Sequence, residues 1–318
     1  MAFYEGGKLI KRLRKQKNIT QEELAYSIVD RATLSKIENG VSESSRETIM
    51  ALLEKLGLHP ESSIDFYLND EQSKAVKIQN ELDSYLGIQV DKSSPAVEKI
   101  DALIEQLESD EVFMQSPRNK QYILIAKACN MVNKEEEPSK SRLVLMEAIS
   151  LNIVAFDEDR IDEYYLTKND VKILNLLGIS YATEGYGSYN TALLDKGINV
   201  FYGLKRNYEL HCLDKHEMGT SYPSFCYNVA NYLWEGKEKY KEAIAICDDG
   251  IKVCKETFHL RLLPFLSACK AACLLHLGKM EEAKTILTQS YYAMCLYGRE
   301  DSANAIKTAM EEKFDIKI

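Results

Sequence analysis

The sequence predicts an all-α protein in which a small N-terminal helical domain is followed by a solenoid of stacked helix pairs. Three observations support this fold class. Two short amphipathic segments with capping residues lie near the start, separated by a tight turn. Beyond residue 70, apolar residues recur at the three-to-four-residue period of a helix and do not alternate convincingly as in a strand. The C-terminal half also contains a degenerate repeat marked by glycines.

The first short segment starts at Thr20. Thr20 can cap the helix while Glu23, three residues later, returns a hydrogen bond to the cap, which is the pattern of a capping box. Leu24, Ala25 and Ile28 then fall on one face. We therefore expect a short helix that begins after Thr20 and buries this face.

The second short segment starts at Asp30, which is a suitable N-cap, and Gly40 is expected to end the helix. Leu34 and Ile37 keep a three-residue apolar spacing. A second helix of such a pair can lie in the major groove of DNA, where residues near its N-terminus reach base edges. The candidate DNA-contacting residues on this segment are Arg31, Ala32, Thr33, Ser35 and Lys36.

These motifs resemble the Cro/CI-type helix-turn-helix family over roughly residues 5–66, and this implies a lambda-repressor-like domain. The resemblance implies that Gln21 contacts a phosphate and that Arg14 and Glu38 form a structural ion pair. One departure is the shorter turn, 26–30, where the family usually has one residue more, often glycine. In this respect the segment 28–40 looks like the peptide-pheromone-responsive regulators of the PlcR and Rgg type.

Charge is distributed unevenly along the chain. Residues 1–60 carry a formal charge of +2, whereas the whole chain carries −9, so the remainder is acidic. Six cations crowd the first predicted helix: Lys8, Lys11, Arg12, Arg14, Lys15 and Lys17. Such a run is often only a solvated face, but beside a recognition helix it favours contact with the phosphate backbone. We take Lys11 as its representative DNA contact.

Composition shifts divide the chain into three parts at 1–68, 69–90 and 91–318. We expect a helix-turn-helix domain in the first, a connecting helix in the second, and in the third a helical-repeat sensor and dimerisation domain, which the repeat described below makes similar to tetratricopeptide (TPR) proteins. Six apolar residues are expected to complete the core of the first part: Ile49, Leu52, Leu53, Leu56, Leu58 and Ile64. The connecting helix is expected over Ser73–Leu86, with a further helix from Val97 to Leu107.

The repeat resembles the tetratricopeptide pattern of helix pairs. The segment 277–283 matches its turn, with Gly278 at the hinge and the small Ala283 at the helix contact. Gly185 and Gly236 open two earlier copies. Gly185 and Gly236 are 51 residues apart, and Gly236 and Gly278 are 42 residues apart; both distances exceed the ~34 residues of the standard repeat. We therefore expect extended helices or enlarged loops.

Stacked helix pairs can hold an extended peptide, whose backbone needs side chains that both donate and accept. The candidate peptide-binding residues are Asn175, Tyr227, Asn228, Asn231 and Lys270. Each of them alone is also consistent with a helix-packing or solvated role. In PlcR and Rgg relatives, asparagines clamp a signalling peptide, and this resemblance favours a short peptide ligand, a homodimer and a pseudo-palindromic operator in double-stranded DNA.

Enzymatic function finds no support, because phosphate-binding, metalloprotease and nucleophile-elbow motifs are absent from the sequence. No cofactor or metal is expected, and the eight cysteines are interpreted as mostly buried, reduced thiols. The sequence also lacks a membrane-spanning run or signal peptide, so a cytoplasmic location is expected. Two alternatives stay open: an adaptor that holds another protein, and a repressor that needs no ligand.

Overall fold

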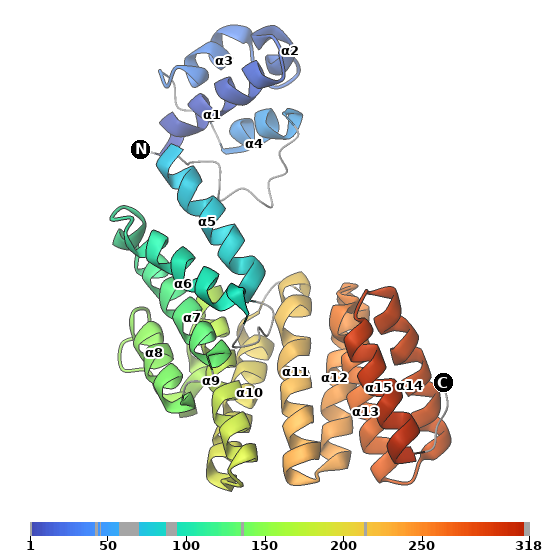
Figure 1. Cartoon of the computed structure of the whole chain (residues 1–318). Coiled ribbons are helices and arrows are strands. Elements are labelled where there is room, and N and C mark those ends of the chain that lie inside the picture. The colour runs from blue at the N-terminus through green and yellow to red at the C-terminus, as the bar shows by residue number, and fades with distance from the viewer. Residues whose placement is uncertain are drawn as a thin grey trace. The chain divides into compact units, whose positions relative to one another are not determined.

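The computed structural model describes residues 2–41, 44, 46–56, 70–86, 94–134, 137–212 and 215–314, and within these ranges every regular element is a helix (Figure 1). The α-helices are α1 (Ala2–Gln16), α2 (Gln21–Ala25), α3 (Arg31–Glu38), α4 (Arg46–Lys55), α5 (Asp70–Leu86), α6 (Pro95–Glu108), α7 (Pro117–Asn133), α8 (Pro138–Ser150), α9 (Lys168–Gly187), α10 (Thr191–His211), α11 (Lys215–Lys237), α12 (Tyr240–Thr257), α13 (Leu263–His276), α14 (Met280–Leu296) and α15 (Glu300–Phe314). Short 3₁₀ turns are η2 (Phe113–Gln115), η3 (Glu158–Glu163) and η4 (Leu260–Leu262). The predicted all-α class is confirmed.

The chain forms two compact units. The first comprises residues 1–90 together with 98–115, and the second comprises residues 91–97 together with 116–318. The first unit therefore includes α1 to α5 and most of α6, whereas α7 to α15 belong to the second.

Helices α1 to α4 form the N-terminal head around one apolar core. Its buried members are Ile10, Leu24, Ala25, Leu34, Ile37, Ile49, Leu52, Leu53 and Leu56. Ile49, Leu52 and Leu53 of α4 and Leu56 just after it are thus in the core, whereas Leu58 and Ile64 lie outside the described residues. Because this core draws on all four helices, it fixes α2 and α3 against α1 and α4.

Helices α5 and α6 follow the spacing that the sequence predicted. On α5, which begins three residues before the expected Ser73, Ala75 and Leu82 are buried. The buried residues of α6 are Val97, Ile100, Leu103, Ile104 and Leu107. Glu81 and Lys99 pair across the two helices at 3.1 Å.

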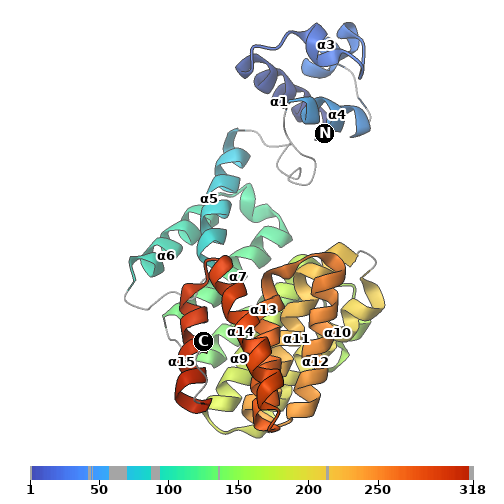
Figure 2. The ribbon, with the colours of Figure 1, turned by 90° about the vertical axis from the view of Figure 1, so that its right-hand side faces the viewer.

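The second unit is a succession of helix pairs, α7/α8, α9/α10, α11/α12 and α13/α14, with α15 packed on α14 (Figures 1 and 2). Each helix contacts the next along the chain. Phe201 and Phe225 are fully buried in two adjoining apolar clusters, and a third cluster lies between α13 and α14. The predicted helical repeat is therefore present.

The repeat glycines occupy different places in their pairs. Gly278 lies in the turn between α13 and α14 with a φ of 75°, a backbone conformation that glycine adopts readily. Gly185 and Gly236 instead lie inside α9 and α11. Ala283 is buried as predicted; at the same place in the two earlier copies, Ala243 is buried but Ala192 is exposed, and the nearby Leu194 is buried.

Candidate DNA-binding and peptide-binding sites

The first helix of the pair, α2, begins with the capping box that the sequence predicted. The backbone nitrogen of Glu23 donates to Oγ1 of Thr20 at 3.1 Å, and the Glu23 carboxylate accepts from the Thr20 backbone nitrogen at 2.8 Å. The backbone N–H and the hydroxyl of Thr20, which both donate to the Glu23 carboxylate, hold the pKa of Glu23 below its ordinary value. Leu24 and Ala25 are buried, so the start and the inner face of α2 are both fixed.

The second helix, α3, is defined at both ends. The Asp30 carboxylate accepts from the Thr33 backbone nitrogen at 2.8 Å and from the Thr33 hydroxyl at 2.6 Å. At the other end Gly40 has a φ of 67° and donates to Ile37, while Val41 donates to Lys36 at 2.8 Å. This paired closure is a Schellman motif, and it confirms the predicted start and stop of the helix.

The turn between α2 and α3 closes without a glycine. Ser27 adopts a left-handed conformation with a φ of 65°. From α4, the ammonium group of Lys55 donates to the carbonyls of Glu23 at 2.6 Å and Tyr26 at 2.8 Å. Lys55 therefore satisfies carbonyl groups at the end of α2, a favourable place for a cation.

A buried ionic cluster joins α1, α2 and α3. Arg14 donates to both Glu38 oxygens, at 2.5 Å and 2.9 Å, and to the Ile19 carbonyl at 3.0 Å. Gln21 also donates to Glu38, at 2.7 Å. Burial would raise the pKa of Glu38, but the bonds from Arg14 and Gln21, with the charges of Arg14 and Lys11, hold it below its ordinary value.

The structure places the predicted DNA-contacting residues in two groups. Arg31, Ala32 and Lys36 are exposed on α3. Thr33, Ser35 and Gln21 are only partly exposed, and the side chains of Thr33 and Gln21 already serve Asp30 and Glu38. The exposed side chains on α3 therefore include one guanidinium, one methyl and one ammonium group.

On α1, Lys11 is tied to the end of the recognition helix. Its ammonium group donates to Oδ1 of Asn39 at 2.7 Å, and the Asn39 amide nitrogen donates to the Ser35 carbonyl at 2.8 Å. Sequence spacing gave no sign of this contact, because 28 residues separate its two members. It joins the predicted phosphate contact on α1 to the exposed side of α3.

In the second unit, two hydrogen bonds connect α9 and α11. Asn228 donates to Oδ1 of Asn175 at 3.0 Å, and the hydroxyls of Thr183 and Tyr232 are 2.8 Å apart. We call these two bonds the α9–α11 rungs. Thr183 and Tyr232 were not predicted, although Thr183 lies eight residues after Asn175 and Tyr232 lies four after Asn228, spacings that keep residues on one helix face.

The other predicted peptide contacts have different partners. Tyr227 meets Phe265 of α13 edge to face, with ring centroids 6.2 Å apart. Asn231 accepts from the Trp234 indole at 3.2 Å, and Lys270 pairs with Asp248 of α12 at 2.7 Å. The structure thus brings Asn175 and Asn228 together and gives Tyr227, Asn231 and Lys270 separate contacts.

Two kinds of feature are absent from the residue ranges that the structure describes: a metal-binding cluster and a membrane-spanning helix. Those ranges contain no group of three or more His, Cys, Asp or Glu side chains that could hold a metal, and no helix long and apolar enough to cross a bilayer. Five of the eight cysteines are buried, while Cys295 is exposed. Burial raises the pKa of Cys129 and of Cys254 to about 11, so these thiols stay protonated.

Residues 10–62 match a family model described as helix-turn-helix. The whole chain is similar to Bacillus thuringiensis PlcR solved with the peptide PapR7 and DNA: identity is 18%, the TM-score is 0.69, and the match covers 95% of this chain and 99% of PlcR. ComR from S. thermophilus, solved with DNA and its signalling peptide ComS, is 15% identical with a TM-score of 0.55, covering 96% and 98%. The Streptococcus dysgalactiae SHP pheromone receptor Rgg2 is 13% identical with a TM-score of 0.57, covering 97% and 100%. The curated proteins contain no match. The chain therefore contains a helix-turn-helix domain within the overall fold of these three proteins.

Proposed function

We propose that this protein is a cytoplasmic transcription regulator that binds a pseudo-palindromic DNA operator as a homodimer and is switched by a short signalling peptide. In this proposal residues 1–68 bind DNA, residues 69–90 connect, and residues 91–318 sense the peptide and dimerise. No catalytic role is included. The observation that carries the proposal is the geometry of α3, a helix capped at both ends that buries Leu34 and Ile37 and exposes Arg31 and Lys36.

The head supports DNA binding through shape and charge together. A helix of this kind fits the major groove, where Arg31 at its first turn can reach a base edge and Lys36 a phosphate. The Arg14–Glu38–Gln21 cluster fixes α3, and Lys55 holds the end of α2, without using these outer side chains. The reading surface is therefore held rigid before DNA arrives, and this lowers the entropic cost of binding.

Peptide sensing is supported by the chemistry of the α9–α11 rungs. An asparagine amide offers two donor hydrogens and two acceptor lone pairs. The bond between Asn228 and Asn175 uses one hydrogen and one lone pair, so both residues keep capacity for the N–H and C=O groups of a peptide backbone. PlcR and ComR, whose fold this chain shares, were both solved with DNA and a peptide. A switch further requires that the peptide favour one protein state over another.

Substitutions in the head should separate base reading from phosphate contact. Arg31→Ala is expected to weaken binding to the selected operator about 10- to 100-fold and to relax the preference at one base position. Lys11→Ala should weaken binding to every duplex to a similar extent, whatever the base sequence of the duplex. Random-duplex selection followed by fluorescence anisotropy measures both effects. Equal operator affinity in the two variants and the parent would contradict these roles.

Peptide binding is tested by screening the full chain against a library of peptides of about five to ten residues, a length suited to a groove-filling ligand. Asn228→Ala should weaken binding of the selected peptide about tenfold, because a backbone group then loses its partner. Asn199→Ala, at an exposed position on α10, removes the same side chain away from the rungs and should leave affinity unchanged.

The screen also distinguishes the two alternatives. Selective capture of a folded protein with no peptide selected would favour the adaptor. Operator binding that no peptide alters would favour a repressor that needs no ligand.

A further inference from the structure

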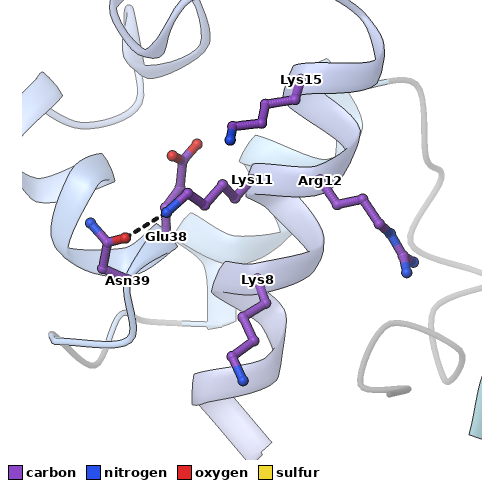
Figure 3. A pocket seen from close by; sticks show the side chains of 6 residues that line it. All are labelled: Lys8, Lys11, Arg12, Lys15, Glu38 and Asn39. Atoms are coloured by element: carbon purple, nitrogen blue, oxygen red, sulfur yellow. Dashed lines mark hydrogen bonds between the residues drawn. The ribbon is translucent and has the colours of Figure 1, made fainter. Parts of the chain in front are cut away.

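A positively charged pocket lies between α1 and the C-terminal end of α3 (Figure 3). It has a cavity volume of about 470 Å³ and is lined by Lys8, Lys11, Arg12, Lys15, Glu38 and Asn39. Four of these six described lining residues are cations, and the one carboxylate among them, Glu38, already accepts two hydrogen bonds from Arg14. The pocket therefore carries excess positive charge, which suits an anionic ligand.

The lysines of the pocket follow one side of α1. Lys8, Lys11 and Lys15 are three and then four residues apart, so they share a helix face and extend over about 10 Å of its axis. In Figure 3, Lys11 reaches Asn39 and Lys15 points to the side where Glu38 lies, whereas Arg12 points away. The arrangement offers a row of ammonium groups, a shape that matches a polyanion better than a single small anion.

The pocket continues the exposed face of α3. Arg31, Ser35 and Asn39 are each four residues apart and therefore lie along one side of that helix. Asn39 contacts both Ser35 and Lys11, so the end of this side of α3 meets the row of lysines on α1 at its middle member. When α3 occupies the major groove, the strand that borders the groove passes this end of the helix, and its phosphates carry the charge that the lysines require.

We propose that this pocket binds backbone phosphates of the DNA strand bordering the groove that α3 reads, with Lys8 and Lys15 as DNA-contacting residues beside Lys11. The inference rests on the proposed DNA-binding function. It adds a binding site on α1 that contributes affinity and register but no base preference. Since ammonium groups contact phosphates irrespective of sequence, the pocket should act equally on every duplex.

The test is the salt dependence of DNA affinity, measured on the full chain with its selected operator between about 50 and 200 mM salt. Each phosphate contact that is removed should reduce the steepness of log K against log salt by about 0.9. Because the proposed homodimer carries each substitution twice, Lys15→Gln should reduce the slope by about 1.8 and the double variant Lys8→Gln/Lys15→Gln by about 3.6, with base preference unchanged. Lys17→Gln is the matched control, because it removes the same charge from an exposed position that does not line the pocket.

The outcomes separate the two proposals. If the parent protein selects no duplex, both the proposed function and the proposed phosphate-binding role of the pocket are wrong. A parent that binds its operator, with pocket variants whose slopes equal those of the parent or of Lys17→Gln, overturns the pocket alone. A free phosphate compound is tested by thermal unfolding in inorganic phosphate against chloride at matched ionic strength. Stabilisation by phosphate that is lost in Lys15→Gln would assign the pocket to such a compound, whereas equal stabilisation of the parent and Lys15→Gln by phosphate supports the DNA backbone.

Discussion

Gly7→Ala is expected to disrupt the head more than any other single methyl group added to it. A Cβ atom at Gly7 would lie 1.8 Å from the carbonyl oxygen of Ile37 and 2.8 Å from its carbonyl carbon. A close carbon-to-oxygen contact needs about 3.3 Å, so α1 and the end of α3 would have to separate. The obstacle is backbone, which cannot rotate away as a side chain can. We expect the free energy of unfolding of the head to fall by about 3 kcal/mol.

Hydrogen exchange of head amides measures this loss locally, because each unit's amides report its own opening. Operator binding should fall in parallel, since α3 carries the reading residues. Gly187→Ala is the control: a Cβ there meets nothing within 4 Å, and a helical alanine should be neutral or more stable by up to about 1 kcal/mol. Unchanged protection of α1 and α3 in Gly7→Ala would contradict the close packing of these helices.

The second large effect is expected from Arg14→Met, which leaves the Glu38 carboxylate buried without its cation. The side chain of Glu38 is 0% exposed and that of Arg14 is 12% exposed. Removing one partner of a buried pair costs about 3 kcal/mol, because the remaining charge is uncompensated. The exposed pair of Arg160 and Glu163 is the matched control, and Arg160→Met should leave the free energy of unfolding nearly unchanged, because solvent screens this pair.

The pH dependence provides a second readout. In the parent, the lowered pKa of Glu38 stabilises the fold above the unfolded pKa, and this contribution is lost as the pH falls through the folded pKa. Without Arg14, burial dominates and raises the pKa of Glu38 above its unfolded value. Stability of Arg14→Met should then increase as the pH is lowered toward the unfolded pKa. Replacing both residues, as Arg14→Met/Glu38→Leu, should recover most of the lost free energy of unfolding. Equal stability of the parent and Arg14→Met at neutral pH would contradict the stabilising role of this pair.

Features governed by neighbours in sequence could be predicted from the sequence alone. The capping box at Thr20, the cap at Asp30 and the stop at Gly40 each depend on groups within four residues, and all three are present. The helical spacing of α5 and α6 was readable for the same reason. Local hydrogen bonds and the spacing of apolar residues determine these elements. Tertiary packing agrees with both and therefore did not change them.

Contacts between distant residues could not be predicted in this way. Gln21 is predicted to contact a phosphate, but the bond from its amide to Glu38 could not be read from the sequence, because 17 residues separate the two. Nothing in the spacing of Lys11 pointed to Asn39, nor did that of Lys55 point to the end of α2. The pairing of Thr183 with Tyr232 likewise depends on how α9 packs against α11. Sequence indicates which face of a helix is polar, whereas packing decides which polar groups meet there.

The α9–α11 rungs have a consequence for the resting protein. Their four side chains are already hydrogen-bonded to one another, so an empty receptor does not bury polar groups that only a ligand could satisfy. Under the proposed function, the receptor can therefore persist and accumulate before any signal is made. The speed of a response would then depend on the arrival of peptide rather than on the synthesis of new receptor.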